Sequence, residues 1–277
     1  MIAAPQRPVL RYFGGKWVLA PWIISYFPPH RVYCEPFGGG ASVLLRKPRS
    51  YSEVYNDLDG EIVNVFRVIR DTPAALWSLL DATPFSRSEF IESYSPSVIP
   101  LEQARRTLAR SFMGFGSNAN NSEQKTGFRA NSNRSNTTAA EDWGNYPKNV
   151  KAYHDRIRGV VIENRDAKEV MLQQDSEETL HFVDPPYVHD TRSEKHGYRH
   201  EMDDQQHEDL CDFLNTLKGM VVLCGYHNPI YDRLGWHYVE REAHADGARD
   251  RIEVLWMNSA AVNASTQISL FATHPPP

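Results

Sequence analysis

The sequence lacks the features of membrane-spanning and secreted proteins. No apolar run approaches the ~20 residues that a transmembrane helix needs. Residues 1–5 contain no charged segment followed by an apolar one, so we expect no signal peptide and a cytoplasmic location.

Cysteine is scarce. Cys34, Cys211 and Cys224 are widely spaced, odd in number and set in apolar segments, which predicts buried free thiols in a reducing compartment. The chain has no CxxC pair, and its 11 histidines show no ligand spacing, so we expect no metal site.

An excess of positive charge is also absent, since the formal net charge is −5. The distribution is uneven, however. Residues 101–158 carry ten Lys/Arg against five Asp/Glu, and the remainder is acidic. This asymmetry predicts an anionic partner for the middle of the chain.

What is present is an alternation of strand-like and helix-like segments within 277 residues, enough for one large domain or a domain with an insertion. This pattern predicts an α/β fold with a mostly parallel sheet. The polar stretch 117–140 is expected to be a loop or small insertion. The expected strands are 31–34, 51–55, 160–163, 179–183, 220–224 and 253–257, and the expected helices are 61–70, continued at 76–80, 105–112 and 204–217.

The tetrapeptide Asp184-Pro185-Pro186-Tyr187 directly follows the apolar run 179–183. Proline fixes its own φ and keeps the preceding residue out of the helical region, so we expect a stiff turn at a strand's carboxyl end. Such a turn suits the binding of a planar base. Asp184 and the Pro185 carbonyl can accept the two hydrogens of an exocyclic amine, while Tyr187 stacks on the ring.

A glycine-rich turn, residues 38–40, follows the strand at 31–34, and Asp57 lies 19 residues after Gly38 at the end of the next strand. Glycines let a ligand approach the backbone, and an acidic residue at about this distance can bind a ribose. The pattern therefore indicates a nucleoside-containing cofactor. Val43 stands where GxGxxG has its third glycine, which counts against NAD.

Taken together, these motifs resemble adenine-specific DNA methyltransferases of the family that includes the bacterial Dam enzymes and their phage relatives. Their order is similar to that of the alpha group of amino-methyltransferases. The matching stretches are Tyr12-Phe13-Gly14-Gly15-Lys16, Glu35-Pro36-Phe37-Gly38-Gly39-Gly40, Asn56-Asp57 and Asp184-Pro185-Pro186-Tyr187, with Gly225-Tyr226 and Arg251-Ile252-Glu253-Val254-Leu255-Trp256 resembling the phage branch.

The resemblance implies a Rossmann-like sheet that uses S-adenosylmethionine as methyl donor and needs no metal. It implies a catalytic domain at 1–80 and 159–272, an inserted target-recognition region at 81–158 and a disordered tail at 273–277. Ala41 and Ala167 depart from the family, which has a glycine and often an aromatic residue there. The implied catalytic residues are Asp184, Pro185 and Tyr187, and the implied cofactor-binding residues are Tyr12, Gly15, Lys16, Glu35, Phe37, Gly39, Asp57 and Asp166.

The implied partner is double-stranded DNA, with a restriction endonuclease as a counterpart in a restriction-modification system. Two polar segments, 111–146 and 188–200, combine basic residues with aromatic ones. Basic side chains anchor phosphates, and Asn and Arg read base edges. The candidate DNA-binding residues are Arg110, Asn118, Lys125, Arg129, Arg134, Arg192, Lys195 and Arg199.

Other interpretations stay open from the sequence. Methylation of the cytosine exocyclic amine uses the same chemistry, although such enzymes more often carry Ser in place of Asp184. RNA or protein-glutamine methyltransferases usually have Asn there. A non-catalytic DNA-binding relative is a further alternative, and a nicotinamide-dependent dehydrogenase would leave the Asp-Pro-Pro-Tyr motif unexplained.

Overall fold

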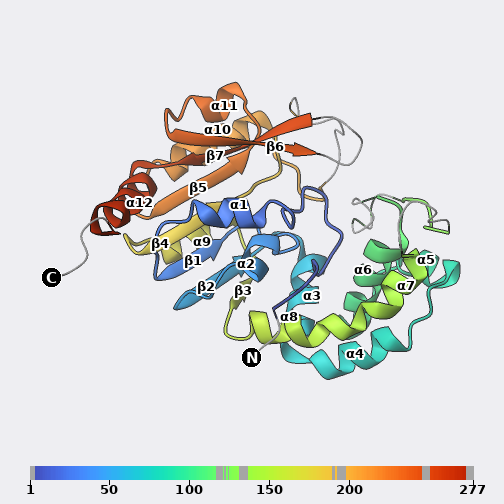
Figure 1. Ribbon diagram of the computed structural model, residues 1–277. Coiled ribbons are helices and arrows are strands. Elements are labelled where there is room, and N and C mark those ends of the chain that lie inside the picture. Colours follow the sequence, from blue (N-terminus) through green and yellow to red (C-terminus); the bar gives the residue numbers. More distant parts are fainter. Residues whose placement is uncertain are drawn as a thin grey trace.

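The computed structural model describes residues 4–116, 121, 123, 125–130, 137–188, 191, 198–244 and 250–272, except for the side chains of 243–244, 250–251 and 267–272. A seven-stranded sheet lies at the centre of this part of the chain (Figure 1). The strands, in spatial order, are β3 (Val161–Glu163), β2 (Ser52–Asn56), β1 (Val32–Glu35), β4 (Thr179–Val183), β5 (Met220–Gly225), β7 (Asp250–Met257) and β6 (His237–His244).

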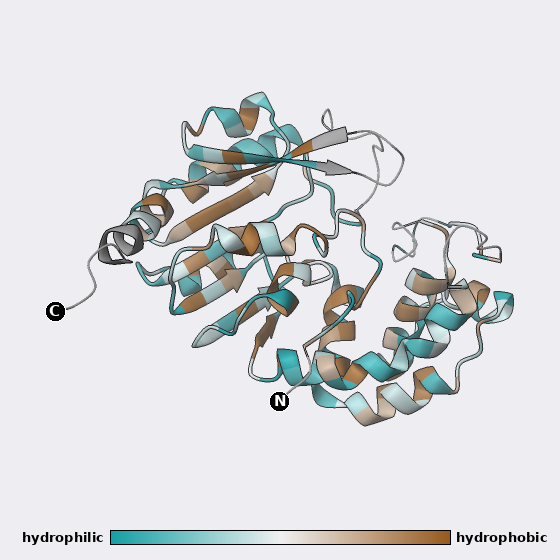
Figure 2. Ribbon diagram, in the orientation of Figure 1, coloured by the Kyte–Doolittle hydropathy of each residue, from teal (hydrophilic) through white to brown (hydrophobic). Residues whose placement is uncertain are grey.

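The first five strands pair in parallel, whereas β7 runs antiparallel to both β5 and β6. The prediction of an α/β fold with a mostly parallel sheet is therefore confirmed. The central strands are apolar because both of their faces are covered. All six residues of β5 are buried, and Figure 2 shows the hydrophobic character of this strand.

Helices form a layer on each face of the sheet. Successive strand side chains point to opposite faces, so Phe182 packs into one layer and Val183 into the other. One layer contains α1 (Ala20–Ser25), α2 (Ser42–Arg46), α3 (Gly60–Asp71), α8 (Val150–Ile157) and α12 (Ser259–Ala272). The other contains α9 (Ala167–Gln174), α10 (Asp204–Leu214) and α11 (Pro229–Asp232).

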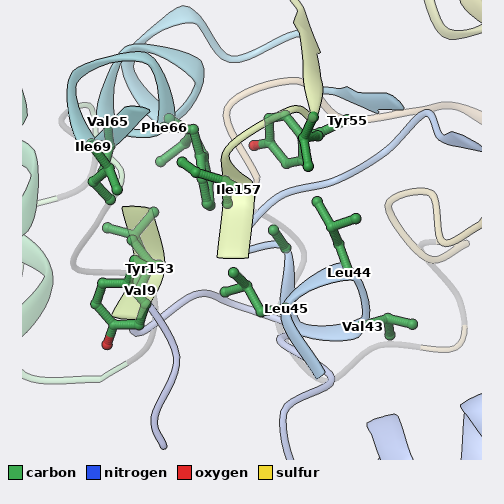
Figure 3. Close-up of a cluster of buried hydrophobic side chains, with 14 of the residues drawn as sticks. Val9, Val43, Leu44, Leu45, Tyr55, Val65, Phe66, Ile69, Tyr153 and Ile157 are labelled. Carbon is green, nitrogen blue, oxygen red and sulfur yellow. The ribbon is translucent and has the colours of Figure 1, made fainter. Parts of the chain in front are cut away.

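The first layer holds much of the core. Figure 3 shows Leu44 of α2, Phe66 of α3 and Ile157 of α8 near Tyr55 of β2. The helix expected at 61–70 is confirmed as α3, and the Asp59 side chain caps it by accepting from the Glu61 N–H. Cys34, Cys211 and Cys224 are buried free thiols, as predicted.

The remaining helices gather at one side of the molecule (Figure 1). They are α4 (Pro73–Asp81), α5 (Arg87–Glu92), α6 (Pro100–Met113), α7 (Ala139–Asn145) and the short 3-10 helix η2 (Pro147–Asn149). The helix α6 packs on α3, and α4 packs on α6 and α8. These helices share the core of the first layer, and the division into a domain at 1–80 and 159–272 with an insertion at 81–158 stays a prediction.

Three details differ from the sequence interpretation. Residues 76–80 do not prolong the preceding helix but belong to α4, which starts afresh at Pro73 because proline lacks the N–H a continuing helix needs. The last strand begins at Asp250, earlier than expected. The edge strand β6 was not predicted, because its sequence is largely polar. The tail 273–277 and most of 117–136 lie outside the described residues.

No described helix combines the length and the apolar character that crossing a lipid bilayer requires.

Candidate active site

The topological switch point of the sheet lies between β1 and β4. The chain builds outward from β1 to β2 and β3, and then returns to place β4 on the other side of β1. In open α/β sheets, ligands bind in the crevice at this point, beyond the carboxyl ends of the strands. The glycine turn leaves β1 there and the Asp-Pro-Pro-Tyr motif leaves β4, and both line one pocket.

The glycine turn is packed against aromatic rings. A Cβ on Gly38 would overlap the Tyr55 ring, and a Cβ on Gly39, whose φ is +45°, would lie 2.6 Å from the Tyr12 ring. Ala41 has φ 51° and ψ 33°, a left-handed conformation that favours glycine. The departure from the family pattern therefore costs backbone strain, typically about 1 kcal/mol.

Asp57 directly follows β2 and contacts the glycine turn. Its Oδ2 accepts from the Gly39 N–H at 2.8 Å, and its Oδ1 accepts from the Asp59 N–H at 2.8 Å. Burial raises the pKa of Asp57 to about 6, although the two N–H donors oppose the rise. Each carboxylate oxygen has a second lone pair, so Asp57 can also accept from ribose hydroxyls.

Lys16 connects the N-terminal motif to the turn after β4. Its Nζ lies 3.1 Å from Asp184 Oδ1, donates to the Gly14 carbonyl at 2.8 Å and sits 4.5 Å from the centroid of the Tyr187 ring. Burial acts to lower the pKa of Lys16, but Asp184 and Glu253 outweigh it and hold the pKa above its ordinary value. The ammonium therefore fills the space between the Asp184 carboxyl group and the Tyr187 face.

Asp184 holds an ammonium group through a carboxyl oxygen that is itself buried. Its Oδ1 is buried and makes the ion pair with Lys16, but it accepts no aligned hydrogen bond from the described residues. Burial raises the pKa of Asp184 to about 6, while the Lys16 ammonium opposes the rise. A buried acceptor of this kind is satisfied when a donor such as an amine enters.

Glu35, the last residue of β1, is also buried against the pocket. Its Oε2 accepts from the Tyr33 hydroxyl at 2.7 Å and from the Leu44 N–H at 3.0 Å. Burial raises the pKa of Glu35 from 4.5 to about 8, although these two hydrogen bonds oppose the rise. The folded protein therefore keeps the Glu35 proton at neutral pH, whereas the unfolded chain releases it.

We expect Glu35→Gln to stabilise the protein at alkaline pH. Between pH 4.5 and 8 the folded state binds one more proton at Glu35 than the unfolded state, so the Glu35 contribution to the unfolding free energy falls as pH rises. Glutamine accepts the same two hydrogen bonds and does not titrate. The advantage of the variant over the wild type should grow by about 3 kcal/mol from pH 6 to pH 9, because the wild type loses about 1.4 kcal/mol for each of the two pH units between 6 and the raised pKa of about 8. Urea unfolding at pH 6 and pH 9 measures this, and an equal pH dependence in both proteins would contradict it.

The structure brings together most of the predicted cofactor residues. Asp166 is different: it caps α9 by accepting from the Lys168 and Glu169 N–H groups, and its predicted contact with a cofactor stays a prediction. Pro185 is buried and is not among the residues that line the pocket, whereas Pro186 is. The predicted residues that line the pocket are Tyr12, Gly15, Lys16, Glu35, Phe37, Gly39, Asp57 and Asp184.

The segment 198–200 also lines this pocket, which sequence reasoning missed. The Tyr198 ring packs edge-on against Phe13, with 5.2 Å between centroids. Arg199 binds Asp59 Oδ1 at 2.8 Å and Glu61 Oε1 at 2.9 Å. Arg199 was predicted to contact DNA, but here its guanidinium fastens the segment to the start of α3. No local sequence signal marks a contact between residues this far apart in the chain.

The predicted DNA-binding residues are dispersed. Arg110 is only 1% exposed, with its guanidinium bound to Glu61 and to the Ser93 carbonyl, so it is not positioned to contact DNA. Lys125 is exposed and Arg129 is half-buried. Asn118, Arg134, Arg192 and Lys195 lie outside the described residues.

Of the ten basic residues in 101–158, five form ion pairs within the described part of the chain, several of them with acidic residues outside that segment. The anionic partner inferred from the basic surplus of this segment therefore has less support than the sequence suggested. The pairs are Arg105 with Glu89 and Glu102, Arg106 with Glu92 and Glu102, Arg110 with Glu61, Lys151 with Asp155, and Arg156 with Glu53.

The aromatic residues predicted to interleave with these basic ones divide into two groups. Trp143 is buried and donates to the Thr83 carbonyl, and Phe128 packs on Phe85 and Phe90. Phe115, in contrast, is 71% exposed, beside the antiparallel bridge between Gly114 and Phe128.

The fold and the site are those of the Rossmann-like amino-methyltransferases. Their shared features are a mostly parallel sheet, a glycine turn after β1, an acidic residue after β2 and Asp-Pro-Pro-Tyr after β4. A family model described as D12 class N6 adenine-specific DNA methyltransferase matches residues 12–241. The chain belongs to this family.

The chain is also similar to the "Type II methyltransferase M1.LlaDCHI" of Lactococcus lactis subsp. cremoris. The two are 38% identical over 77 residues, which amount to 27% of this chain and 26% of that protein. The match thus spans about a quarter of the curated relative's length.

Proposed function

We propose that this protein transfers a methyl group from S-adenosylmethionine to the exocyclic N6 amine of adenine in double-stranded DNA. The observation that carries the proposal is the buried Oδ1 of Asp184, which holds the Lys16 ammonium over the Tyr187 ring at the switch point of the sheet. Membership of the D12 class family supports the choice of adenine.

The pocket residues fit a nucleoside-containing methyl donor. The residues from Gly38 to Gly40 carry no side chains, so a ligand can approach their backbone closely. Asp57 can accept hydrogen bonds from ribose hydroxyls, and the rings of Tyr12 and Phe37 supply apolar walls. When bound, S-adenosylmethionine would supply a methyl group activated by its attachment to a sulfonium.

The protein's own residues would prepare the amine to receive this group. The adenine amine is a poor nucleophile because its lone pair is delocalised into the ring. Asp184 and the Pro185 carbonyl would accept its two hydrogens and favour a pyramidal nitrogen, so most of the rate increase would come from positioning and electrostatics. The Lys16 ammonium would have to leave the space between Asp184 and Tyr187 to admit the base.

A base inside a duplex is out of reach of this pocket. It would have to be flipped out, at a cost of a few kcal/mol. Stacking on Tyr187 would recover part of this cost, since a base–aromatic stack contributes about 1–3 kcal/mol. The exposed side chains of Lys125 and Phe115 lie in the region 81–158, which we propose meets the DNA.

The biological setting is part of the same proposal. We infer that the protein acts on DNA in the cytoplasm, and that a restriction endonuclease is its counterpart. The name of the Lactococcus lactis relative, a Type II methyltransferase, supports the second inference. No observation favours transfer to the cytosine amine.

Asp57→Ala is expected to weaken S-adenosylmethionine binding about ten- to a hundredfold, because hydrogen bonds to a charged group contribute about 1.5–3 kcal/mol. At saturating methyl donor the transfer rate should stay close to that of the wild type. Isothermal titration calorimetry gives the affinity, and Asp71→Ala, at an exposed carboxylate on α3, is the matched control. Unchanged affinity would contradict the proposed role of Asp57 in binding the cofactor.

The proposal is tested by incubating the protein with labelled S-adenosylmethionine and, in parallel, with unmethylated duplex DNA, structured RNA and a protein mixture. Label should enter the DNA alone. Label confined to RNA or protein would contradict the choice of substrate, and label in none of them would support a non-catalytic relative.

A further inference from the structure

The hydroxyl of Tyr187 is held by a residue from a distant strand. It donates to Glu253 Oε2 on β7 at 2.7 Å, across a separation of 66 positions in the chain. Both side chains are only 5% exposed. Cys224 of β5 lies 3.3 Å from the same hydroxyl and 3.6 Å from Glu253 Oε2. A buried carboxyl group is costly unless it is hydrogen-bonded, and the Tyr187 hydroxyl and the Cys224 thiol are the groups that lie within hydrogen-bonding distance of Glu253 Oε2.

The Tyr187 ring is also fixed along its length. The Lys16 ammonium lies over the ring at 4.5 Å from the centroid, and the Tyr226 ring meets it edge-on at 4.6 Å and 82°. A tyrosine side chain turns about two bonds, and anchoring its hydroxyl restricts both of them. The orientation of the ring is therefore set at the far end, by Glu253.

The anchored ring faces the space where the base would bind. The Lys16 ammonium that covers the ring is the same group that lies 3.1 Å from Asp184 Oδ1. A ligand that replaced the ammonium would thus meet the Asp184 carboxyl group and the Tyr187 face at once. If the ring tilted, the stack and the hydrogen bond could not both form.

We infer that Glu253 is a positioning residue for methyl transfer: it holds the Tyr187 hydroxyl so that the ring presents its face to the target base next to Asp184. This inference rests on the proposed function. Glu253 touches neither the base nor the methyl donor and acts through the Tyr187 hydroxyl, although its charge also helps to hold the pKa of Lys16 above its ordinary value.

The test compares Glu253→Gln with Glu253→Leu. Glutamine keeps an oxygen that accepts from the Tyr187 hydroxyl, whereas leucine has a similar size and accepts nothing. With saturating methyl donor and unmethylated DNA, the single-turnover rate of the leucine variant should fall about ten- to a hundredfold, and the glutamine variant should stay within about threefold of the wild type. The affinity for S-adenosylmethionine should not change in either variant.

A double-mutant cycle with Tyr187→Phe shows whether Glu253 acts through the hydroxyl. Tyr187→Phe should slow transfer about as much as Glu253→Leu, and the double variant should be no slower than either. Equal loss in the glutamine and leucine variants, independent losses that multiply in the double variant, or a leucine variant with the wild-type rate would each overturn the positioning role.

Two further results keep the proposals separate. Thermal unfolding shows whether Glu253→Leu folds. If it does not, the comparison of Glu253→Gln with Tyr187→Phe still tests the positioning role, because wild-type rates in both variants would overturn the inference. If the wild type itself transfers no label to DNA, the proposed function fails, and the role of Glu253 fails with it.

Discussion

Replacing Asp184 with alanine is expected to lower the rate of methyl transfer to DNA by about a hundred- to a thousandfold, the loss typical when one group that stabilises the transition state is removed. Alanine cannot accept the amine hydrogen, so the nitrogen lone pair stays delocalised into the adenine ring. The affinity for S-adenosylmethionine should stay within about threefold, because the proposed cofactor contacts, Asp57 and the glycine turn, are unchanged in this variant. Transfer of labelled methyl groups gives the rate, and calorimetry gives the affinity.

The control must account for Lys16, which loses its closest carboxyl partner when Asp184 is removed. Thermal unfolding of Asp184→Ala therefore accompanies the rate measurement. Asp212→Ala, an exposed carboxylate on α10, should behave like the wild type in both. Equal loss of rate and cofactor affinity in Asp184→Ala would contradict the role assigned to this residue.

Glu53→Gln is expected to lower the free energy of unfolding by about 3 kcal/mol or more. Glu53 is 3% exposed, and its Oε1 binds Lys47 Nζ at 2.7 Å and Arg156 Nη2 at 3.0 Å, while its Oε2 binds Arg156 Nη1 at 2.7 Å. Glutamine carries no negative charge, so the buried Lys47 and Arg156 side chains lose their charged partner. Urea unfolding at neutral pH measures the loss, and Glu177→Gln, at an exposed position, should change stability by less than about 0.5 kcal/mol.

The effect should depend on pH in a defined direction. Burial acts to raise the pKa of Glu53, but the Arg156 and Lys47 side chains outweigh it and hold the pKa below its ordinary value of 4.5. Its stabilising contribution is therefore complete above pH 4.5 and is lost as pH falls through the lowered pKa. The difference between wild type and variant should shrink in acid. A difference as large at pH 3 as at pH 7 would show that the charge is not its source.

The parts of the site that follow directly from strand ends could be predicted from the sequence. Gly38, Asp57 and Asp184 each lie just beyond a segment expected to be a strand, and parallel strands end at the same edge of a sheet. The local pattern was therefore enough to predict that these three residues lie close together. The polar edge strand β6 has no such pattern, and its register is set only by pairing with β7.

The contacts that join distant segments could not be predicted. Lys16 was expected to line the cofactor pocket, but nothing in its neighbours indicates that its ammonium reaches Asp184. Glu253 was part of a recognised motif without an assigned role, because only the fold places it on the Tyr187 hydroxyl. Arg110 and Arg199 looked like free basic residues, and the fold turns both toward Glu61.

The most direct test of the proposed activity is the identity of the methylated nucleoside. DNA lacking prior methylation would be incubated with the protein and S-adenosylmethionine, digested to nucleosides and examined by mass spectrometry. We expect N6-methyl-2′-deoxyadenosine, and none when Asp184→Ala replaces the wild type. A methylated cytidine, or no methylated nucleoside despite bound S-adenosylmethionine, would contradict the assignment of this pocket to the adenine amine.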